Sequence, residues 1–390
     1  MNKFSKVFGN KYSVIILGIT ILLCLFGILM VYSASCYTAE QNYGSSTYFM
    51  VKQIVGFVIG LVVMFVLSRL NYNFLSRFYI WALILGFVLL VVVLIPGVGV
   101  SNYGARRWIG FGAFSFQASE VAKFCFIIFC AGYMSKNFDK MTTFRGSLPV
   151  LLSGLGMCGL ILLEPNMSVT ICMGVVMIVM LLIGGMRIKH LAYMSVPIAG
   201  AVPLLILLEP YRLKRLFAFV DPWASPQGEG FQLIQSLYAL GAGGWFGVGL
   251  FNSRQKYAFL PFSESDFIFS IIGEEFGFVG AVLLLAVFGL LIYYGYKVSI
   301  NAKDRFGCYL GVGITSILAV QVLLNVAVVS GAVPPTGLPL PFISAGSTSL
   351  IMFMAGMGIL ANIAKSSGLR ANTLNYSQKL FVKRKKEVTH

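Results

Sequence analysis

Ten long runs of apolar residues follow one another along this chain and constrain its fold more than any other feature. The runs lie at 13–35, 50–68, 78–96, 118–135, 147–163, 167–186, 189–208, 267–296, 308–330 and 347–364. A bilayer core about 30 Å thick is crossed by a helix of roughly 20 apolar residues. Inside lipid every backbone N–H and C=O must be satisfied within the structure, which leaves helices or closed barrels. Because the runs are continuous rather than alternating, they predict an all-α integral membrane protein, a bundle of about ten transmembrane helices.

The composition agrees with a membrane environment. Hydrophobic residues make up 58% of the chain and charged residues only 11%, whereas about a quarter of a soluble domain is charged. The first run follows Lys3, Lys6 and Lys11 like a signal peptide. It is longer than the 7–15 apolar residues of such a peptide, so it is interpreted as an uncleaved anchor.

The distribution of Lys and Arg predicts the orientation. With the N-terminus in the cytoplasm, 20 of the 29 fall on the inner side, 8 on the outer side, and Lys123 lies within a run. This is the positive-inside bias, and it puts both termini in the cytoplasm. The net charge of +16 therefore requires no nucleic acid partner. The basic tail 371–390 is expected to lie near anionic membrane lipids.

Three segments of the single membrane domain, 1–370, depart from the short connections that are usual in helix bundles. They lie at 97–117, 209–266 and 331–346, all on the predicted outer side, and the last has four prolines. Segments of this length carry function or are disordered, and their aromatic content argues against disorder. The seven cysteines show no metal-ligand spacing and there are only two histidines, so the sequence predicts packing cysteines rather than a zinc site.

The outer cations oppose the topological bias and need an explanation. They are Lys52, Arg106, Arg107, Arg212, Lys214, Arg215, Arg254 and Lys256. If the outer loops fold together, a cluster of these side chains suits a diphosphate, because Arg binds phosphate oxygens with two parallel hydrogen bonds. The alternative is a belt of side chains that reach the lipid headgroups.

Several acidic residues stand in unusual places. Asp266 ends the second outer segment and precedes an apolar run, so it is either a helix N-cap or a functional carboxylate at the membrane boundary. Glu274 and Glu275 fall two turns later, inside the hydrocarbon if the helix spans from 267, where carboxylates are functional candidates. Lys123 is a possible partner for them.

Two simpler interpretations stay open for the remaining acids. Glu120 lies three residues before Lys123, which allows a local ion pair on one helix face. Glu164 belongs to the sequence Glu-Pro-Asn at an outer turn, where turn chemistry is sufficient to explain it.

Four long blocks carry a resemblance to a known family. They are GARRWIGFGAFSFQASEVAK at 104–123, EGFQLIQSLYALGAGGWFGVGLFNSRQKYAFLP at 229–261, SDFIFSIIGEEFGFVG at 265–280 and NVAVVSGAVPPTGLPLPFISAGSTS at 325–349. In order and content the chain resembles the SEDS family (shape, elongation, division and sporulation), which includes FtsW, RodA and SpoVE, and is nearest to the FtsW and SpoVE branch. It departs from the family in having Ala118 in place of a proline and its acid at Glu264 rather than directly after Pro261.

The resemblance implies a peptidoglycan glycosyltransferase of the bacterial cytoplasmic membrane that polymerises lipid II at the outer face, in division, elongation or spore wall synthesis. Asp266 matches the family's essential aspartate and is expected to be the general base. Arg106, Arg107, Arg254 and Lys256 are expected to bind the leaving diphosphate, with Mg²⁺ or Mn²⁺ as a possible helper.

Further expectations follow from the same resemblance. Five charged residues are expected to support the site: Glu120, Lys123, Glu264, Glu274 and Glu275. The partner implied is a class B penicillin-binding protein, which crosslinks the new strand. The alternatives are a lipid II flippase and a non-enzymatic scaffold of the division or sporulation machinery.

Overall fold

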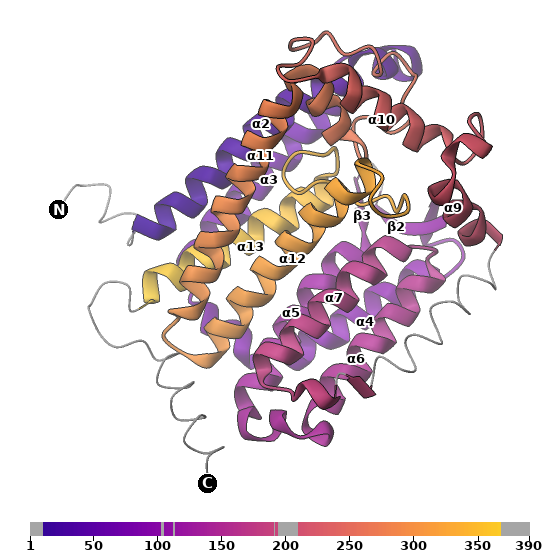
Figure 1. Cartoon of the computed structure of the whole chain (residues 1–390). Helices are drawn as coiled ribbons and strands as arrows, with labels where there is room; N and C mark the ends of the chain where they lie inside the picture. The colour runs from indigo at the N-terminus through magenta and orange to yellow at the C-terminus, as the bar shows by residue number, and fades with distance from the viewer. Residues whose placement is uncertain (1–10, 103–104, 112–113, 191, 194–209, 368–390) are drawn as a thin grey trace.

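The computed structural model describes residues 11–102, 105–111, 114–190, 192–193 and 210–367 (Figure 1). Its helices are α2 Lys11–Tyr43, α3 Tyr48–Arg69, α4 Tyr79–Leu94, α5 Ala118–Lys136, α6 Phe144–Leu163, α7 Met167–Gly184, α9 Pro210–Val220, α10 Phe231–Gly243, α11 Ile268–Ile300, α12 Arg305–Val329 and α13 Ser347–Ser366. Short 3₁₀ turns cover Tyr72–Arg77, Phe138–Thr142 and Pro222–Ala224.

The all-α membrane fold predicted from the sequence is confirmed. Eight of the described helices are long and apolar enough to cross a membrane, and α4 is a shorter apolar helix. Nine of the ten predicted spans coincide with these helices. The seventh, 189–208, falls almost entirely outside the described residues.

Local sequence signals explain where several helices begin and end. The side chains of Thr143, Asn166 and Asp304 accept hydrogen bonds from the backbone N–H of Gly146, Val169 and Gly307, and so cap α6, α7 and α12. Such caps satisfy N–H groups that have no partner within the helix. Gly185 ends α7 in the left-handed conformation that glycine adopts without strain.

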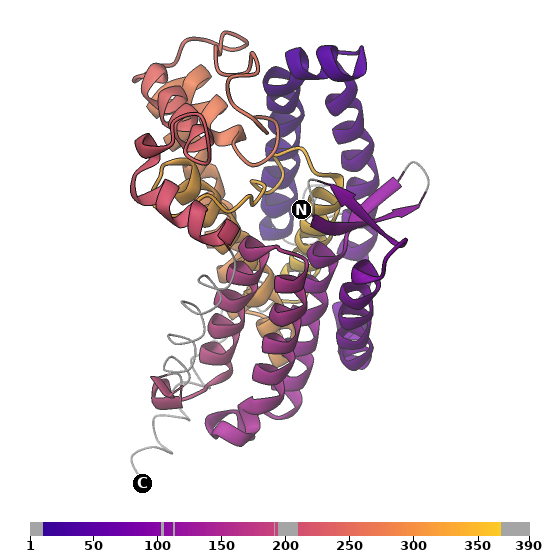
Figure 2. The same cartoon turned by 90° about the vertical axis from the view of Figure 1, so that its right-hand side faces the viewer.

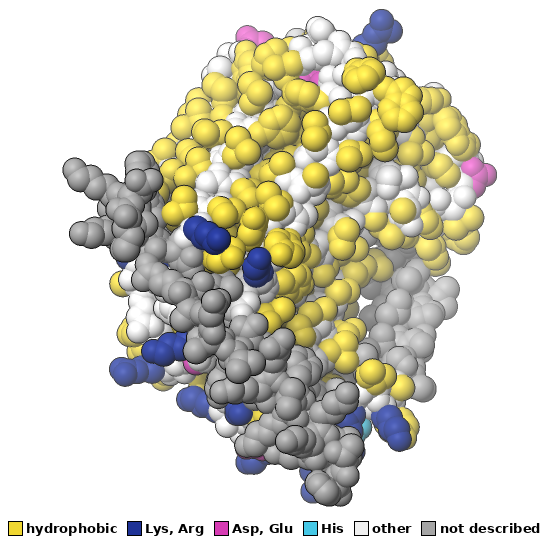
Figure 3. All heavy atoms as spheres, turned by 60° about the vertical axis from the view of Figure 1, so that its left-hand side comes forward, with side chains coloured by type: hydrophobic (Ala, Val, Ile, Leu, Met, Phe, Trp, Pro, Cys, Tyr) yellow, Lys and Arg dark blue, Asp and Glu magenta, His cyan; other side chains and the backbone are white. Residues whose placement is uncertain are grey.

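The bundle has two chemically different ends. In Figure 3 hydrophobic side chains cover most of the visible face, and Lys and Arg gather along its lower left and lower edge. We call this the basic end. The opposite end carries β1–β3, α9 and α10, as Figures 1 and 2 show, and we call it the loop end.

The segment 97–117, predicted as a long connection on the outer side, contains a small antiparallel sheet. Its strands, β1 Gly99–Asn102, β2 Ala105–Phe111 and β3 Phe114–Gln117, are hydrogen-bonded in the order β1-β2-β3. Ile109 is buried with Val93 and Ala118. This small apolar cluster fixes the sheet on the ends of α4 and α5.

Helix α11 is two helical segments divided at Gly277, where φ is 68° and ψ is −170°. The second segment runs antiparallel to α12, because Tyr296 and Ser316 share a hydrogen bond of 2.9 Å and a Cβ on Gly311 would contact Ser299. Were α11 straight, its first residues would project far beyond the loop end of α12.

The first segment of α11 instead folds back beside α12. The Asn325 side chain donates to the Asp266 carbonyl at 2.9 Å, and Ser236 links Ser270 to the Val329 carbonyl through two hydrogen bonds of 2.7 Å. From Asp266 to Ser270, therefore, the chain runs in the same direction as α12 from Asn325 to Val329. The chain thus forms a re-entrant segment that enters the bundle from the loop end, and Asp266 is the residue of this segment that lies deepest in the bundle.

The break at Gly277 exposes backbone groups that the segment after α10 satisfies. Val248 N–H donates to the Glu274 carbonyl at 2.9 Å, and Phe278 N–H donates to the Gly244 carbonyl at 2.9 Å. A Cβ on Gly277 would lie 2.3 Å from the Gly247 nitrogen. Unpaired backbone groups of a membrane protein must be satisfied by protein or water, and these hydrogen bonds satisfy them; the two glycines allow the close approach that the bonds require.

Candidate active site

Asp266 lies where two re-entrant segments meet. Asn325 donates to the carbonyls of both Asp266 and Leu338, at 2.9 and 2.6 Å, and the Ser344 hydroxyl donates to the Ser265 carbonyl at 2.5 Å. The proline-rich segment 331–346 is thereby fixed against the start of α11. A Cβ on Gly337 would lie 2.9 Å from Asp266 Oδ2, so only glycine leaves room for the carboxylate here.

The Asp266 side chain does not cap α11. The N-cap position is Phe267, without a side-chain cap, and no described residue donates a hydrogen bond to the Asp266 carboxylate. The side chain is half-buried. Burial and, to a smaller extent, the charge of Glu264 raise its pKa, and Arg107 and Arg215 lower it; the net result is a pKa of about 6 in place of 3.8. A carboxylate with free lone pairs and a pKa near neutrality is suited to accept a proton.

Two arginines from different segments of the loop end act on Asp266. Arg107, on β2, donates from Nε to the Glu164 carbonyl at 3.1 Å and from a terminal nitrogen to the Pro165 carbonyl. Arg215, on α9, donates to the Pro335 carbonyl at 3.0 Å. Arg215 bonds to the chain two residues before Gly337, whose Cβ position lies beside Asp266 Oδ2. Both positive charges lower the pKa of Asp266, so the segments that carry Arg107 and Arg215 both act on this carboxylate.

The other predicted cations are placed differently. Arg106 precedes Arg107 on the same strand and is exposed, whereas Arg107 is partly buried at a β-bulge, where the pairing of β1 with β2 shifts by one residue. Arg254 is also exposed, and its backbone N–H donates to Glu274 at 2.9 Å. Lys256 is buried, so the expectation that it faces a diphosphate does not fit its surroundings.

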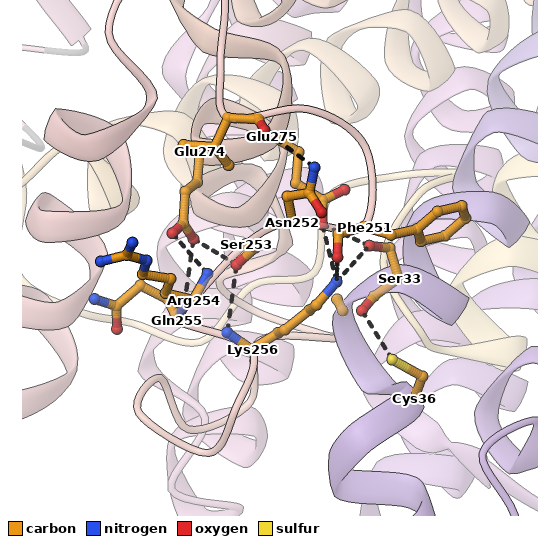
Figure 4. Close-up of polar contacts among 12 residues, drawn as sticks. Ser33, Cys36, Phe251, Asn252, Ser253, Arg254, Gln255, Lys256, Glu274 and Glu275 are labelled. Atoms are coloured by element: carbon orange, nitrogen blue, oxygen red, sulfur yellow. Dashed lines mark hydrogen bonds and ion pairs between the residues drawn. The ribbon is translucent and has the colours of Figure 1, made fainter.

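Lys256 belongs to a cluster that we call the latch: Ser33, Ser253, Lys256, Glu274 and Glu275 (Figure 4). Lys256 Nζ lies 3.3 Å from Glu275, and the Ser33 hydroxyl donates to the same carboxylate oxygen at 2.6 Å. Glu274 accepts from the Ser253 hydroxyl. The latch connects Glu274 and Glu275, near the break in α11, to α2 and to the loop that precedes α11.

The latch corrects the expected depth of the two glutamates. Ser33 lies 22 residues after Lys11, the first residue of α2, which is about 33 Å along a helix and comparable to the bilayer core of about 30 Å. Glu275 contacts Ser33, so with α2 entering the bilayer at Lys11 it would lie near the opposite membrane boundary rather than two turns inside the hydrocarbon. The physical reason is the break at Gly277, which turns the first segment of α11 back on the second.

Lys123 does not pair with Glu274 or Glu275. It pairs with Glu120 at 2.7 Å, the local alternative, and donates to Gln321 at 2.8 Å. Gln321 in turn donates to the Pro339 carbonyl at 2.9 Å. This buried network connects α5 and α12 to the proline-rich segment, and so supports the backbone beside Asp266.

Two further carboxyls lie near Arg107 and Asp266. Glu164 is fully buried, and burial raises its pKa to about 8 although Arg107 lowers it. Burial also raises the pKa of Glu264. No group of three His, Cys, Asp or Glu side chains comes together in the part of the chain that the structure describes. A divalent cation beside Asp266 would therefore take most of its ligands from substrate phosphates and water, as Mg²⁺ commonly does.

Three residues of the site were not singled out from the sequence. Arg215 was one of eight outer cations with nothing to distinguish it. Asn325 and Gln321 lie within an apolar run, and a polar amide inside a predicted span is the signal that points to them.

Comparison with known proteins gives consistent matches. A family model for cell cycle proteins of the FtsW, RodA and SpoVE type matches residues 13–368. The chain is 40% identical to Stage V sporulation protein E of Bacillus subtilis, over 90% of this chain and 96% of that protein. It is 38% identical to the probable peptidoglycan glycosyltransferase FtsW of Trichlorobacter lovleyi, over 92% and 94%.

Solved structures share the fold. One, described as "Structural coordination of polymerization and crosslinking by a peptidoglycan synthase complex", is 28% identical with a TM-score of 0.74 and covers 90% of this chain and 96% of its own. The rod shape determining protein RodA of Thermus thermophilus is 23% identical with a TM-score of 0.65, over 90% and 96%.

Proposed function

This chain belongs to the FtsW/RodA/SpoVE family, and we propose that it is a peptidoglycan glycosyltransferase with Asp266 as its general base. The observation that carries the role of Asp266 is its carboxylate, half-buried, without a hydrogen bond from the described residues and flanked by the charges of Arg107 and Arg215. Family membership and the names of the relatives support the reaction.

The proposed reaction joins two lipid II molecules, or adds one to a growing strand. The 4-hydroxyl of the acceptor sugar attacks the anomeric carbon of the donor, and its proton passes to the Asp266 carboxylate. The bond from the anomeric carbon to the lipid diphosphate breaks as the new glycosidic bond forms. Arg107 and Arg215 stabilise the charge that develops on the departing diphosphate.

We also propose that the loop end faces the outside of the bacterial cytoplasmic membrane and that both termini are cytoplasmic. The gathering of Lys and Arg at the basic end supports this orientation. Single cysteines at the exposed positions 224 and 332 should react with an impermeant thiol reagent in intact cells, and cysteines at the exposed positions 140 and 303 only after lysis. Labelling of 224 from the cytoplasm alone would refute the orientation and the outward site with it.

Polymerisation of lipid II by purified protein in detergent tests the reaction. We expect glycan strands, and a higher rate when a cognate class B penicillin-binding protein is present, as expected for a synthase complex that both polymerises and crosslinks. Lipid II that moves across vesicle membranes without being polymerised would favour a flippase. No effect on lipid II, alone or with any partner, would favour a scaffold.

Arg107→Ala should slow polymerisation roughly ten- to hundredfold, because charge-assisted hydrogen bonds contribute about 1.5–3 kcal/mol each. Since Arg107 lowers the pKa of Asp266, the acidic limb of the pH–rate profile should also move to higher pH. Arg106→Ala is the matched control and should lose less of its activity. Equal losses without a change in the pH profile would instead indicate a general contribution to headgroup binding.

A further inference from the structure

A separate open cavity of about 770 Å³ lies between α9, the segment 221–229 and α10. The charged residues that line it come from two parts of the chain. Lys214 and Arg215 come from α9, and Asp221 and Glu229 come from the segment that follows it. Gln227 contributes an amide that both donates and accepts hydrogen bonds.

The cavity adjoins the site around Asp266. Arg215 lines it and also acts electrostatically on Asp266. Pro261, which lines it too, precedes the re-entrant descent to Asp266 by five residues. A group extending from a sugar diphosphate held by Arg215 would therefore reach this cavity directly.

We propose that this cavity binds the peptide of the donor substrate, a proposal that rests on the proposed function. The muramyl sugar carries its peptide two ring carbons from the anomeric carbon that is attacked, so the donor's peptide leaves the reaction centre at its edge. A short peptide with free carboxylates and an amino group complements a wall that presents two cations and two carboxylates. The volume is in the range of sites for small ligands.

The shape and chemistry of the cavity favour a small polar ligand over a protein surface. Protein interfaces have cores with few charges, whereas four charged side chains line this hollow. A lipid chain would require an apolar lining instead. The donor peptide is the one occupant that both the charge pattern and the position beside Arg215 suit.

The test compares two substrates in the same polymerisation assay: lipid II with its full peptide, and lipid II truncated after the first peptide residue. The variant is the double substitution Asp221→Asn/Glu229→Gln, which removes both negative charges with little change of shape. Asp221 accepts a hydrogen bond from Trp223 N–H, and Asn retains this capping role. Glu40→Gln, an exposed site on the same side of the bundle, is the matched control.

We expect the KM of the wild-type protein to be about three- to tenfold higher for truncated lipid II, as exposed charge pairs contribute modestly. The double variant should raise the KM for the full substrate by a similar factor and leave the KM for the truncated one unchanged. Equal effects on both substrates, or no effect, would overturn the proposal. A change seen only when the penicillin-binding protein is present would reassign the cavity to that partner.

A second measurement is independent of polymerisation. Binding of free stem pentapeptide to the detergent-solubilised protein, followed by saturation-transfer NMR, should be seen for the wild type and Glu40→Gln and be weakened in the double variant. Peptide binding without polymerisation would count against the proposed function but not against the cavity. Polymerisation with no peptide binding and no substrate difference would count against the cavity alone.

Discussion

Asp266→Asn should reach the membrane and fold normally, yet polymerise lipid II about 10²–10⁴-fold more slowly, the usual contribution of general acid–base catalysis. An amide matches the carboxylate in size, so the space that Gly337 leaves beside it stays filled. It cannot accept the proton of the attacking hydroxyl. Because the Asp266 side chain caps no helix and accepts no hydrogen bond from the described residues, loss of activity cannot be attributed to a lost side-chain contact.

The matched control is Asp139→Asn, an exposed Asp between α5 and α6, which should keep its activity within about twofold because such surface sites change stability little. The wild-type profile should also show an acidic limb near the pKa of Asp266, about 6. Activity should rise with pH through this value, because only the ionised carboxylate is a base. A folded Asp266→Asn protein with the wild-type rate would move the search for the base to Glu264.

The helices could be predicted because their signal is local: continuous apolar runs require helices in lipid. The choice of Asp266 as the proposed base rests on the four sequence blocks shared with a family. The folded-back α11 could not be predicted, because the run 267–296 is equally compatible with one straight span. The only local sign of the break is Gly277, and the predicted spans of this chain contain many other glycines.

The pairing of charged residues could also not be predicted from the sequence. Lys256 and Glu275 are 19 residues apart and meet only because α11 turns back. The same turn brings Asp266 down to Asn325. Local spacing, by contrast, was sufficient for Glu120 and Lys123, which lie one helical turn apart. Where the tertiary path of the chain decides a contact, periodicity carries no information about it.

Gly277→Ala should reduce polymerisation about a hundredfold or more, although the substitution only adds one methyl group, 11 residues after Asp266. At φ 68° and ψ −170° the backbone is in a region that is essentially restricted to glycine, and a side chain there costs on the order of 1–3 kcal/mol. Its Cβ would also lie 2.3 Å from the Gly247 nitrogen. The backbone around Gly277 must therefore shift, and the first segment of α11, a rigid helix, would transmit that shift to Asp266.

A displacement of about 1 Å at reacting groups can cost 10²-fold in rate, so the loss should appear even in protein that remains folded in detergent. Gly289→Ala is the control, on the same helix, where a Cβ would meet nothing within 4 Å. It should keep its activity. Gly247→Ala approaches the same contact from the opposite side, since its Cβ would lie 2.1 Å from the Glu275 carbonyl, and it should resemble Gly277→Ala. If both variants polymerise lipid II as fast as Gly289→Ala, the contact between the two glycines does not position the base, and Asn325 and Ser344 must hold Asp266 in place on their own.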